Sequence, residues 1–383
     1  GLEHFPILTK TELRSNYKAI VTRGFERSVS LCKTSGSTGI PLRFYRDKVT
    51  FGHTLASVYR AHRWYGLDVG AKEAMLWGIP ADRTSRLQAR LRDFVLNRFR
   101  EKEYDLTSEV LDDFYRKIRR RRPDYLFGYS SMVYEFAAYC RENNHPAQEL
   151  GLKAAICTAE TIHPFQREII EAALGCPVVS EYGAAETGII SYQCPAGNHH
   201  VADDVVLLEL VGDDGQHVGA GEIGRVLVTV LFSHAAPIIR YELGDFAVRS
   251  GATCSCGVNL SLIDGVVGRT SGIIVTPSGK RFHSIVLYYI MKQYADRFGG
   301  VRQFRVRQTH RDRLELHIAA EDAFSDVAKQ WLYDTFKRKF GMDMSVELFL
   351  HSRLVRNTSG KLTDFHSDVA PDASALENLA HDS

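Results

Sequence analysis

The sequence lacks any long apolar segment. No uninterrupted run approaches the roughly 20 residues that cross a bilayer, and no basic-then-apolar leader opens the chain. We therefore expect no integral membrane segment. A surplus of one charge is also missing, because 48 Lys and Arg stand against 46 Asp and Glu, for a net charge of +2. A nucleic-acid-binding domain needs a clear basic excess, so nucleic acid is not an expected partner.

Cysteine is scarce as well, with 7 in 383 residues, and the seven are scattered along the chain. This pattern excludes the disulfide framework of a small secreted domain and favours a reduced, cytoplasmic protein. Apolar residues make up 44% and charged residues 25% of the sequence. These are the shares of a globular protein, which excludes intrinsic disorder, collagen and a coiled coil as the main architecture.

The length suffices for about two domains. Thr9 and Glu12 stand at capping-box spacing and predict a short helix, and apolar residues recur at helical spacing over 107–120. Between residues 150 and 185, short apolar runs flank a helical segment, as in a βαβ unit. Further strands are expected over three segments: 205–210, 225–232 and 238–241.

After residue 268 the pattern changes. A hairpin is expected over 304–307 and 314–318, followed by a helix near 322–340 and a last strand over 346–350. These elements predict a small α+β unit. We therefore divide the chain into a large domain (1–268), a small domain (269–366) and a flexible tail (367–383).

A stretch rich in glycine and hydroxyl groups lies near the N-terminus: Thr34, Ser35, Gly36, Ser37, Thr38 and Gly39. Glycines let the backbone turn tightly and expose N–H groups, and hydroxyls add further donors, which together suit a polyphosphate. The Gly-Lys-[Ser/Thr] ending of a Walker motif is absent. Taken alone, such a stretch is more often a plain turn.

Four further motifs follow in order. Residues 181–188 read Glu-Tyr-Gly-Ala-Ala-Glu-Thr-Gly, and residues 240–245 read Arg-Tyr-Glu-Leu-Gly-Asp. Gly268-Arg269 marks the domain boundary, and residues 357–361 read Asn-Thr-Ser-Gly-Lys. From about Phe5 to Lys361 the sequence resembles the adenylate-forming superfamily, and most closely the phenylacetate–CoA ligase family, whose relatives also occur in capsular-polysaccharide gene clusters. That family usually has additional residues before this point, so we expect the chain to be short at its start.

The resemblance implies an α/β fold, with a large N-terminal adenylate-forming domain of layered sheets and helices and a small, mobile α+β C-terminal domain. It also implies a two-step reaction. A carboxylate first attacks the α-phosphate of ATP, giving an acyl-adenylate and pyrophosphate, and CoA then displaces AMP. Attack on a polyanion depends on charge neutralisation more than on a protein nucleophile.

The resemblance further implies a role for each motif in nucleotide binding. The loop from Thr34 to Gly39 would hold the β- and γ-phosphates. Ala159 and Glu160 would line the adenine pocket. Tyr182, followed by Gly183, would stack on adenine.

The charged residues of the motifs would handle the ribose, the phosphates and the metal. Glu186 would hold magnesium, which prefers carboxylate oxygen. Asp245 would accept both ribose hydroxyls, and Arg269 would reach the ribose or a phosphate. Lys361 would bridge the α-phosphate and the attacking carboxylate. Each of these residues also has a purely structural alternative, such as a turn carboxylate, an interdomain ion pair or an exposed loop lysine.

Two positions depart from the family pattern. The family commonly has a hydroxyl residue immediately before the motif glutamate, where this chain has Ala185, so one hydrogen bond to the α-phosphate would have to come from elsewhere. The family often has Asp three residues after the boundary arginine, where this chain has Gly272. Glycine is more permissive, which leaves the pivot between the domains less defined.

A second kind of site is suggested by Cys194, His200, Cys254 and Cys256. Two thiolates on one short loop, together with a distant cysteine and histidine, form a Cys3His set that favours zinc in a closed, structural site. His199 is an alternative to His200 as the imidazole ligand. The alternative to a metal site is that the cysteines are reduced surface residues. The remaining cysteines are expected to be small core residues: Cys32, Cys140, Cys157 and Cys176.

The acid pocket has the weakest signal. Its candidates lie around His53, Tyr129, Ser130 and Tyr182, with Trp77 nearby. Aromatic side chains would suit an aryl or arylacetic acid, but core aromatics look the same in a sequence.

We predict an AMP-forming ligase that uses ATP and magnesium, carries structural zinc, and transfers an aromatic or small organic acid to CoA. One alternative is an amide-forming ligase in which an amine, such as an amino sugar or amino acid, replaces CoA. Another is a non-catalytic nucleotide-binding protein of polysaccharide assembly. The oligomeric state stays open, with a homodimer among the alternatives.

Overall fold

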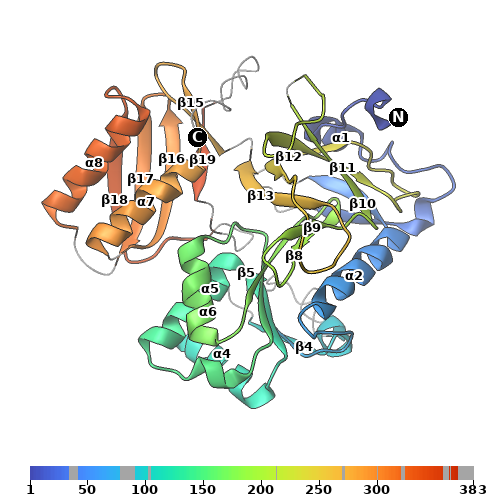
Figure 1. Cartoon of the computed structure of the whole chain (residues 1–383), viewed down its shortest axis with the longest axis horizontal. Coiled ribbons are helices and arrows are strands. Elements are labelled where there is room, and N and C mark those ends of the chain that lie inside the picture. Colours follow the sequence, from blue (N-terminus) through green and yellow to red (C-terminus); the bar gives the residue numbers. More distant parts are fainter. Residues whose placement is uncertain are drawn as a thin grey trace.

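The computed structural model describes these residues: 1–33, 42–77, 91–101, 105–212, 214–269, 272–299, 301–320, 324–356, 362 and 364–369. Figure 1 shows that the part of the chain after residue 272 lies to one side of the rest, which consists of a helix-rich part and a strand-rich part. Among the described helices, none is both long and apolar enough to cross a membrane.

An 11-stranded sheet runs through the helix-rich and strand-rich parts. Its strands are β3 (Glu73–Leu76), β4 (Arg98–Glu101), β5 (Tyr125–Tyr129), β6 (Ala154–Thr158), β7 (Val178–Ala184), β8 (Gly188–Gln193), β9 (His199–Val201), β10 (Val206–Val211), β11 (Ile223–Val230), β12 (Tyr241–Arg249) and β13 (Leu262–Arg269). They follow the order β10-β11-β12-β13-β9-β8-β7-β6-β5-β3-β4. The five strands β4, β3, β5, β6 and β7 pair in parallel, and the others pair antiparallel.

Helices accompany the parallel strands because the central strands are buried on both faces. Every residue of β6 is buried, as expected of a parallel strand that needs cover on each side. The helices of this part are α4 (Ser108–Arg121), α5 (Ser130–Glu142), η3 (Ala147–Leu150) and α6 (Pro164–Leu174). Helix α4 confirms the helix expected over 107–120. Thr107 caps its first turn, and Leu111, Phe114, Tyr115 and Ile118 form its buried stripe. The βαβ unit of β6, α6 and β7 is also confirmed.

The antiparallel part contains the N-terminal elements as well. These are η1 (Leu2–His4), α1 (Lys10–Asn16), η2 (Glu26–Ser28), the hairpin of β1 (Val29–Lys33) and β2 (Arg43–Asp47), and α2 (Lys48–Arg63). Thr9 and Glu12 form the expected capping box of α1.

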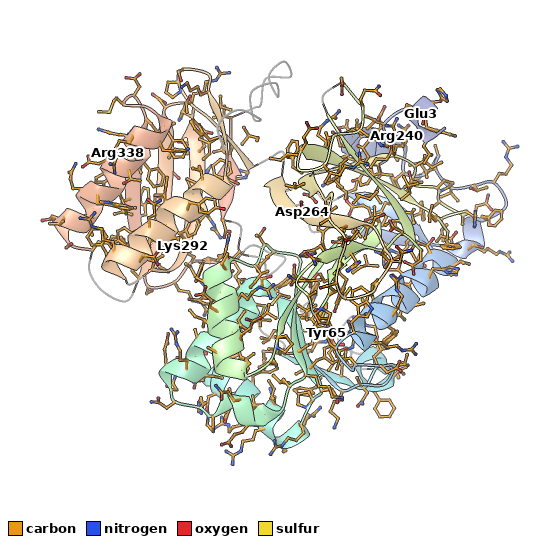
Figure 2. The ribbon with its side chains drawn as sticks, viewed as in Figure 1. Glu3, Tyr65, Arg240, Asp264, Lys292 and Arg338 are labelled. Carbon is orange, nitrogen blue, oxygen red and sulfur yellow. The ribbon has the colours of Figure 1, made fainter. Side chains whose placement is uncertain are left out.

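One strand prediction in this part is wrong. The apolar run 238–241 precedes β12, which begins at Tyr241. The backbone of Arg240 has a φ of 47°, a left-handed conformation that lies outside the β region. Its guanidinium donates to Glu209 at 3.2 Å and to the carbonyl oxygen of Phe5 at 2.9 Å, and it lies beside Glu3 in Figure 2. A tertiary contact therefore breaks the run.

The C-terminal part is a separate α+β unit. It consists of the hairpin of β14 (Ile273–Val275) and β15 (Arg281–His283), helices α7 (Ile285–Phe298) and α8 (Asp326–Phe340), and a sheet of β16 (Val301–His310), β17 (Arg313–Ala320), β18 (Ser345–His351) and β19 (Phe365–Ser367) in the order β18-β17-β16-β19. The expected hairpin, helix and last strand are confirmed. This unit has its own apolar core, which includes Ile290, Val306, Leu316 and Phe336. The division at residues 268/269 stays a prediction. Of the predicted tail (367–383), Ser367 ends β19 and Asp368 accepts from Arg307, whereas residues 370–383 lie outside the described residues.

Candidate nucleotide site and metal cluster

Several predicted site residues lie at the carboxyl edge of the parallel strands. Trp77 follows β3, Tyr129 ends β5, and Ala159 with Glu160 follows β6. The rings of Trp77 and Tyr129 stack with their centroids 4.2 Å apart. Ligands of open parallel sheets bind outside this edge, because the strand-to-helix turns leave a crevice there. The topology therefore supports a ligand site where the motifs converge.

Tyr182 and Asp245 meet across this region although 63 residues separate them in the sequence. The Tyr182 hydroxyl lies 2.9 Å from Oδ2 of Asp245 and donates to it. Asp245 is 5% exposed, and its backbone on β12 pairs with that of Arg269 on β13. The structure thus brings three of the predicted nucleotide-binding residues to one place. The Arg269 side chain lies outside the described part.

The turn between β7 and β8 carries Glu186. The hydroxyl of Tyr241, a fully buried residue at the start of β12, lies 3.3 Å from Oε1 of this carboxylate. Burial, and then the Glu186 charge, raise the pKa of Tyr241, so its hydroxyl stays protonated and can donate. Arg46 on β2 donates to the carbonyl oxygen of Ala185. Side chains from two other strands therefore hold this turn in place.

Gly183 has a steric reason to be glycine. A Cβ atom at this position would lie 2.5 Å from the carbonyl oxygen of Gly188, which is closer than real Cβ atoms approach. The backbones of β7 and β8 are therefore too close for a side chain there, and the turn that carries Glu186 depends on that close approach.

Glu160 connects the carboxyl edge with the C-terminal part. It follows Ala159, whose φ of 66° lies in the left-handed region, an uncommon conformation for a residue other than glycine. The Glu160 carboxylate accepts from the backbone N–H of Ser131, at the start of α5, at 2.9 Å and from that of Leu362 at 2.7 Å. Burial raises the pKa of Glu160, and the Arg356 guanidinium opposes that rise. Residues from three separate segments thus meet at one carboxylate.

Two predicted elements fall outside the described residues. These are the phosphate loop from Thr34 to Gly39 and the residue Lys361. Leu362 follows that lysine in the sequence and is described. Its backbone N–H donates to the Glu160 carboxylate. The loop's described flanks are β1, which ends at Lys33, and Leu42 before β2.

The predicted metal ligands come together in a second place. One ligand atom from each of Cys194, His200, Cys254 and Cys256 lies within 4.8 Å of all the others. The sulfur atoms of Cys194 and Cys254 are 3.5 Å apart, and Sγ of Cys256 is 3.2 Å from Nε2 of His200. His199 points elsewhere, because its Nδ1 lies 3.4 Å from the hydroxyl of Ser191.

The chemistry of this cluster suits a zinc ion. Two sulfurs that are each about 2.3 Å from a tetrahedral zinc lie about 3.8 Å apart, and the sulfurs of Cys194 and Cys254 are 3.5 Å apart. Hydrogen bonds from the backbone N–H of Cys256 and from the Asn198 side chain lower the pKa of Cys254 to about 6. A thiolate is the form that binds metal.

The remaining predictions have mixed outcomes. Cys140, Cys157 and Cys176 are buried, as expected, whereas Cys32 is only half-buried. The difference arises because Cys32 belongs to β1, which among the described strands pairs only with β2, in a two-stranded sheet. Among the acid-pocket candidates, His53 stacks on Phe232 with the ring centroids 3.8 Å apart.

Ser130 is engaged as well, because its hydroxyl donates to the carbonyl oxygen of Glu160. It therefore belongs to the Glu160 region and not to an identified acid pocket.

Three residues that contact the predicted site residues were not themselves predicted from the sequence. Tyr241 lies inside the 240–245 motif, so its position beside Asp245 could have drawn attention to it. Arg46 contacts a residue 139 positions away, and Arg356 contacts residues more than 200 positions away. No local pattern marks these two arginines.

No family model matches this sequence, but curated proteins do. Protein CapK of Staphylococcus aureus is 24% identical over 250 residues, which are 64% of this chain and 53% of CapK. Phenylacetate-coenzyme A ligase of Thermus thermophilus is 26% identical over 159 residues, covering 40% of this chain and 36% of that protein. Indoleacetate–lysine synthetase of Pseudomonas savastanoi is 22% identical over 271 residues, covering 64% and 60%. The chain thus spans about half the length of the curated relatives it matches.

Solved structures share the fold. The crystal structure of 2-hydroxyisobutyryl-CoA ligase in the postadenylation state, in complex with R3-HIB-AMP, superposes with a TM-score of 0.73 at 18% identity. The match covers 95% of this chain and 80% of the ligase chain. It confirms the α/β fold class with a smaller C-terminal unit. The curated relatives and this fold together place the chain in the adenylate-forming superfamily, as the sequence motifs indicated.

Proposed function

We propose that this protein activates a carboxylic acid with ATP, as an acyl-adenylate, and then transfers the acyl group to CoA. The observation that supports this most is the convergence at one sheet edge of residues from separate motifs, namely Tyr182 with Asp245, and Glu160 with the segment at Leu362. The superfamily likeness supports the same activity, because one solved neighbour is a CoA ligase in the postadenylation state, in complex with R3-HIB-AMP.

The described residues suit this chemistry. Asp245 is buried and held by the Tyr182 hydroxyl, so it is fixed in position to accept hydrogen bonds from ribose hydroxyls. Glu186 offers carboxylate oxygens, the ligands that magnesium prefers, and the Tyr241 contact fixes its orientation. Magnesium bound there would neutralise phosphate charge. The loop from Thr34 to Gly39, Arg269 and Lys361 complete the proposed set.

Cys194, His200, Cys254 and Cys256 would hold one zinc ion. The cluster joins the end of β8, β9 and the loop between β12 and β13. All four ligands would come from the protein, which is the arrangement of a structural site and not of a catalytic one. A cytoplasmic location and a homodimer remain predictions.

The first experiment is a panel of aromatic and small organic acids, screened by ATP-dependent pyrophosphate release. We expect acid-dependent ATP–pyrophosphate exchange with at least one of them. Lys361→Ala should lower the exchange rate roughly 100- to 1000-fold, the usual effect of losing one charge-stabilising group. Lys18→Ala, at an exposed lysine, is the matched control and should leave the rate unchanged. Equal rates in both variants would refute the role of Lys361.

A second candidate is amide formation, and the likeness to indoleacetate–lysine synthetase favours it. It shares the first step and differs in the acceptor. AMP release measured on adding CoA, in parallel with lysine or an amino sugar, separates the two. If no acid supports exchange while the protein still binds ATP, the non-catalytic alternative replaces both.

A further inference from the structure

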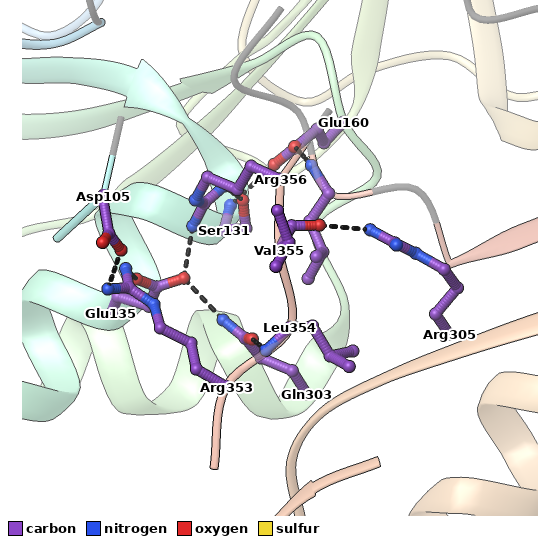
Figure 3. Close-up of polar contacts among 11 residues, drawn as sticks. Asp105, Ser131, Glu135, Glu160, Gln303, Arg305, Arg353, Leu354, Val355 and Arg356 are labelled. Atoms are coloured by element: carbon purple, nitrogen blue, oxygen red, sulfur yellow. Dashed lines mark hydrogen bonds and ion pairs between the residues drawn. The ribbon is translucent and has the colours of Figure 1, made fainter. Parts of the chain in front are cut away.

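The carboxylate of Glu135 connects the two main parts of the molecule. Glu135 lies on α5, and Figure 3 shows it facing three donors from the C-terminal part. The Gln303 side chain donates to Oε1 at 2.6 Å, Arg353 donates to Oε2 at 3.1 Å, and Arg356 donates to Oε1. One side chain on the large unit thus accepts from β16 and from the segment that follows β18.

The two central residues of this set of contacts, Glu135 and Arg356, are shielded from solvent. The side chain of Glu135 is 14% exposed and that of Arg356 is 6% exposed. Asp105 also pairs with Arg353, but its side chain is 76% exposed. Buried ion pairs couple their partners far more strongly than exposed pairs, which salt and water screen. The pair of Glu135 and Arg356 is therefore the strong contact, and Asp105 belongs to its rim.

The same network reaches the candidate nucleotide site. Arg356 donates with its other terminal nitrogen to the hydroxyl of Ser131 at 2.6 Å. The backbone N–H of Ser131 binds the Glu160 carboxylate, which also accepts from Leu362. A continuous path of polar contacts thus leads from Glu135 through Arg356 and Ser131 to Glu160.

We propose that Glu135 is a positioning residue for acyl-adenylate formation. By fixing Arg356 against α5, it holds the segment around Leu362 on Glu160, and the first step depends on this arrangement. This inference rests on the proposed function. Glu135 touches neither nucleotide nor acid in this scheme. It acts only through the position of the C-terminal segment, so the second step, transfer from a preformed adenylate, does not need it.

The test compares Glu135→Gln, which keeps the shape and removes the charge, with Asp105→Asn as matched control. Hydrogen exchange of the free full-length chain is followed by mass spectrometry. We expect faster exchange in the segments 351–356 and 364–369 of Glu135→Gln, with α8 unchanged and the control like wild type. The adenylation rate, measured by pyrophosphate exchange with the best acid of the panel, should fall about 100-fold, as expected from a misplacement of about 1 Å. Acceptor-dependent AMP release from the synthetic acyl-adenylate of that acid should change less than about 3-fold.

The outcomes separate the inference from the proposed function. Unchanged hydrogen exchange in Glu135→Gln overturns the inference whatever the activity. Equal losses in both half-reactions also overturn it, because they indicate a general structural defect. A wild type without any acid-dependent exchange refutes the proposed function, while hydrogen exchange still decides whether Glu135 holds the segment.

Discussion

Removing the metal cluster offers the most direct quantitative test of the structure. The perturbation is Cys254→Ser combined with Cys256→Ser, which deletes two of the four proposed ligands. A bound ion would link Cys194 with Cys254, which are 60 residues apart in the sequence. Treated as a cross-link that closes a loop of this length, it restricts the unfolded chain by about 4 kcal/mol. For a cooperative unit of about 270 residues, that corresponds to a fall in Tm of about 7 °C.

Two measurements check this prediction. Elemental analysis of the purified wild type should find about one zinc per chain, and the double variant should retain little. Thermal unfolding followed by circular dichroism should show the Tm difference, and a strong chelator should lower the Tm of the wild type to that of the variant. Cys32→Ser is the control, because Cys32 is a half-buried cysteine outside the cluster. It should respond to the chelator as wild type does.

A wild type that is purified without metal, unfolds at the same temperature with and without chelator, and matches the double variant would refute the zinc site. A metal-bound wild type with an unchanged Tm in the variant would refute only the cross-link reasoning, since the ion would then not restrict the unfolded chain.

Three further predictions concern the strand that carries Tyr182. Gly183→Ala would bring a Cβ atom to 2.5 Å from the Gly188 carbonyl oxygen, and we expect urea unfolding to show a loss of about 1–3 kcal/mol. Tyr182→Phe removes the hydrogen bond to Asp245, so the KM for ATP in pyrophosphate exchange should rise about 10-fold; an unchanged KM would contradict the proposed role. Burial raises the pKa of Glu181 from 4.5 to about 7, so the folded state keeps a proton that the unfolded chain releases, and stability falls as the pH rises from about 4.5 through 7. Glu181→Gln should remove that slope, leaving the free energy of unfolding at pH 4 unchanged and adding about 3 kcal/mol at pH 8, as calorimetry at the two pH values would reveal.

Elements with strong local patterns were predictable. The helix α4 has a regular apolar stripe and a capping threonine, and the βαβ unit has a fully buried strand beside an amphipathic helix. In these segments the burial of the apolar face and the local backbone preference agree. The run 238–241 has the same apolar character, yet residues 238–240 are not a strand: Arg240 has a left-handed backbone there, and its side chain contacts distant residues.

The candidate site also has features that were predictable from the sequence and features that were not. The residue types of the site could be read directly from the sequence, from the Cys3His set to Glu186 and Asp245. The contacts between them come from the fold: Tyr182 meets Asp245, and Glu135 accepts from a segment 221 residues away. The physical reason is that local patterns report burial and backbone preference, whereas the pairing of distant polar groups depends on how the strands and helices pack against one another.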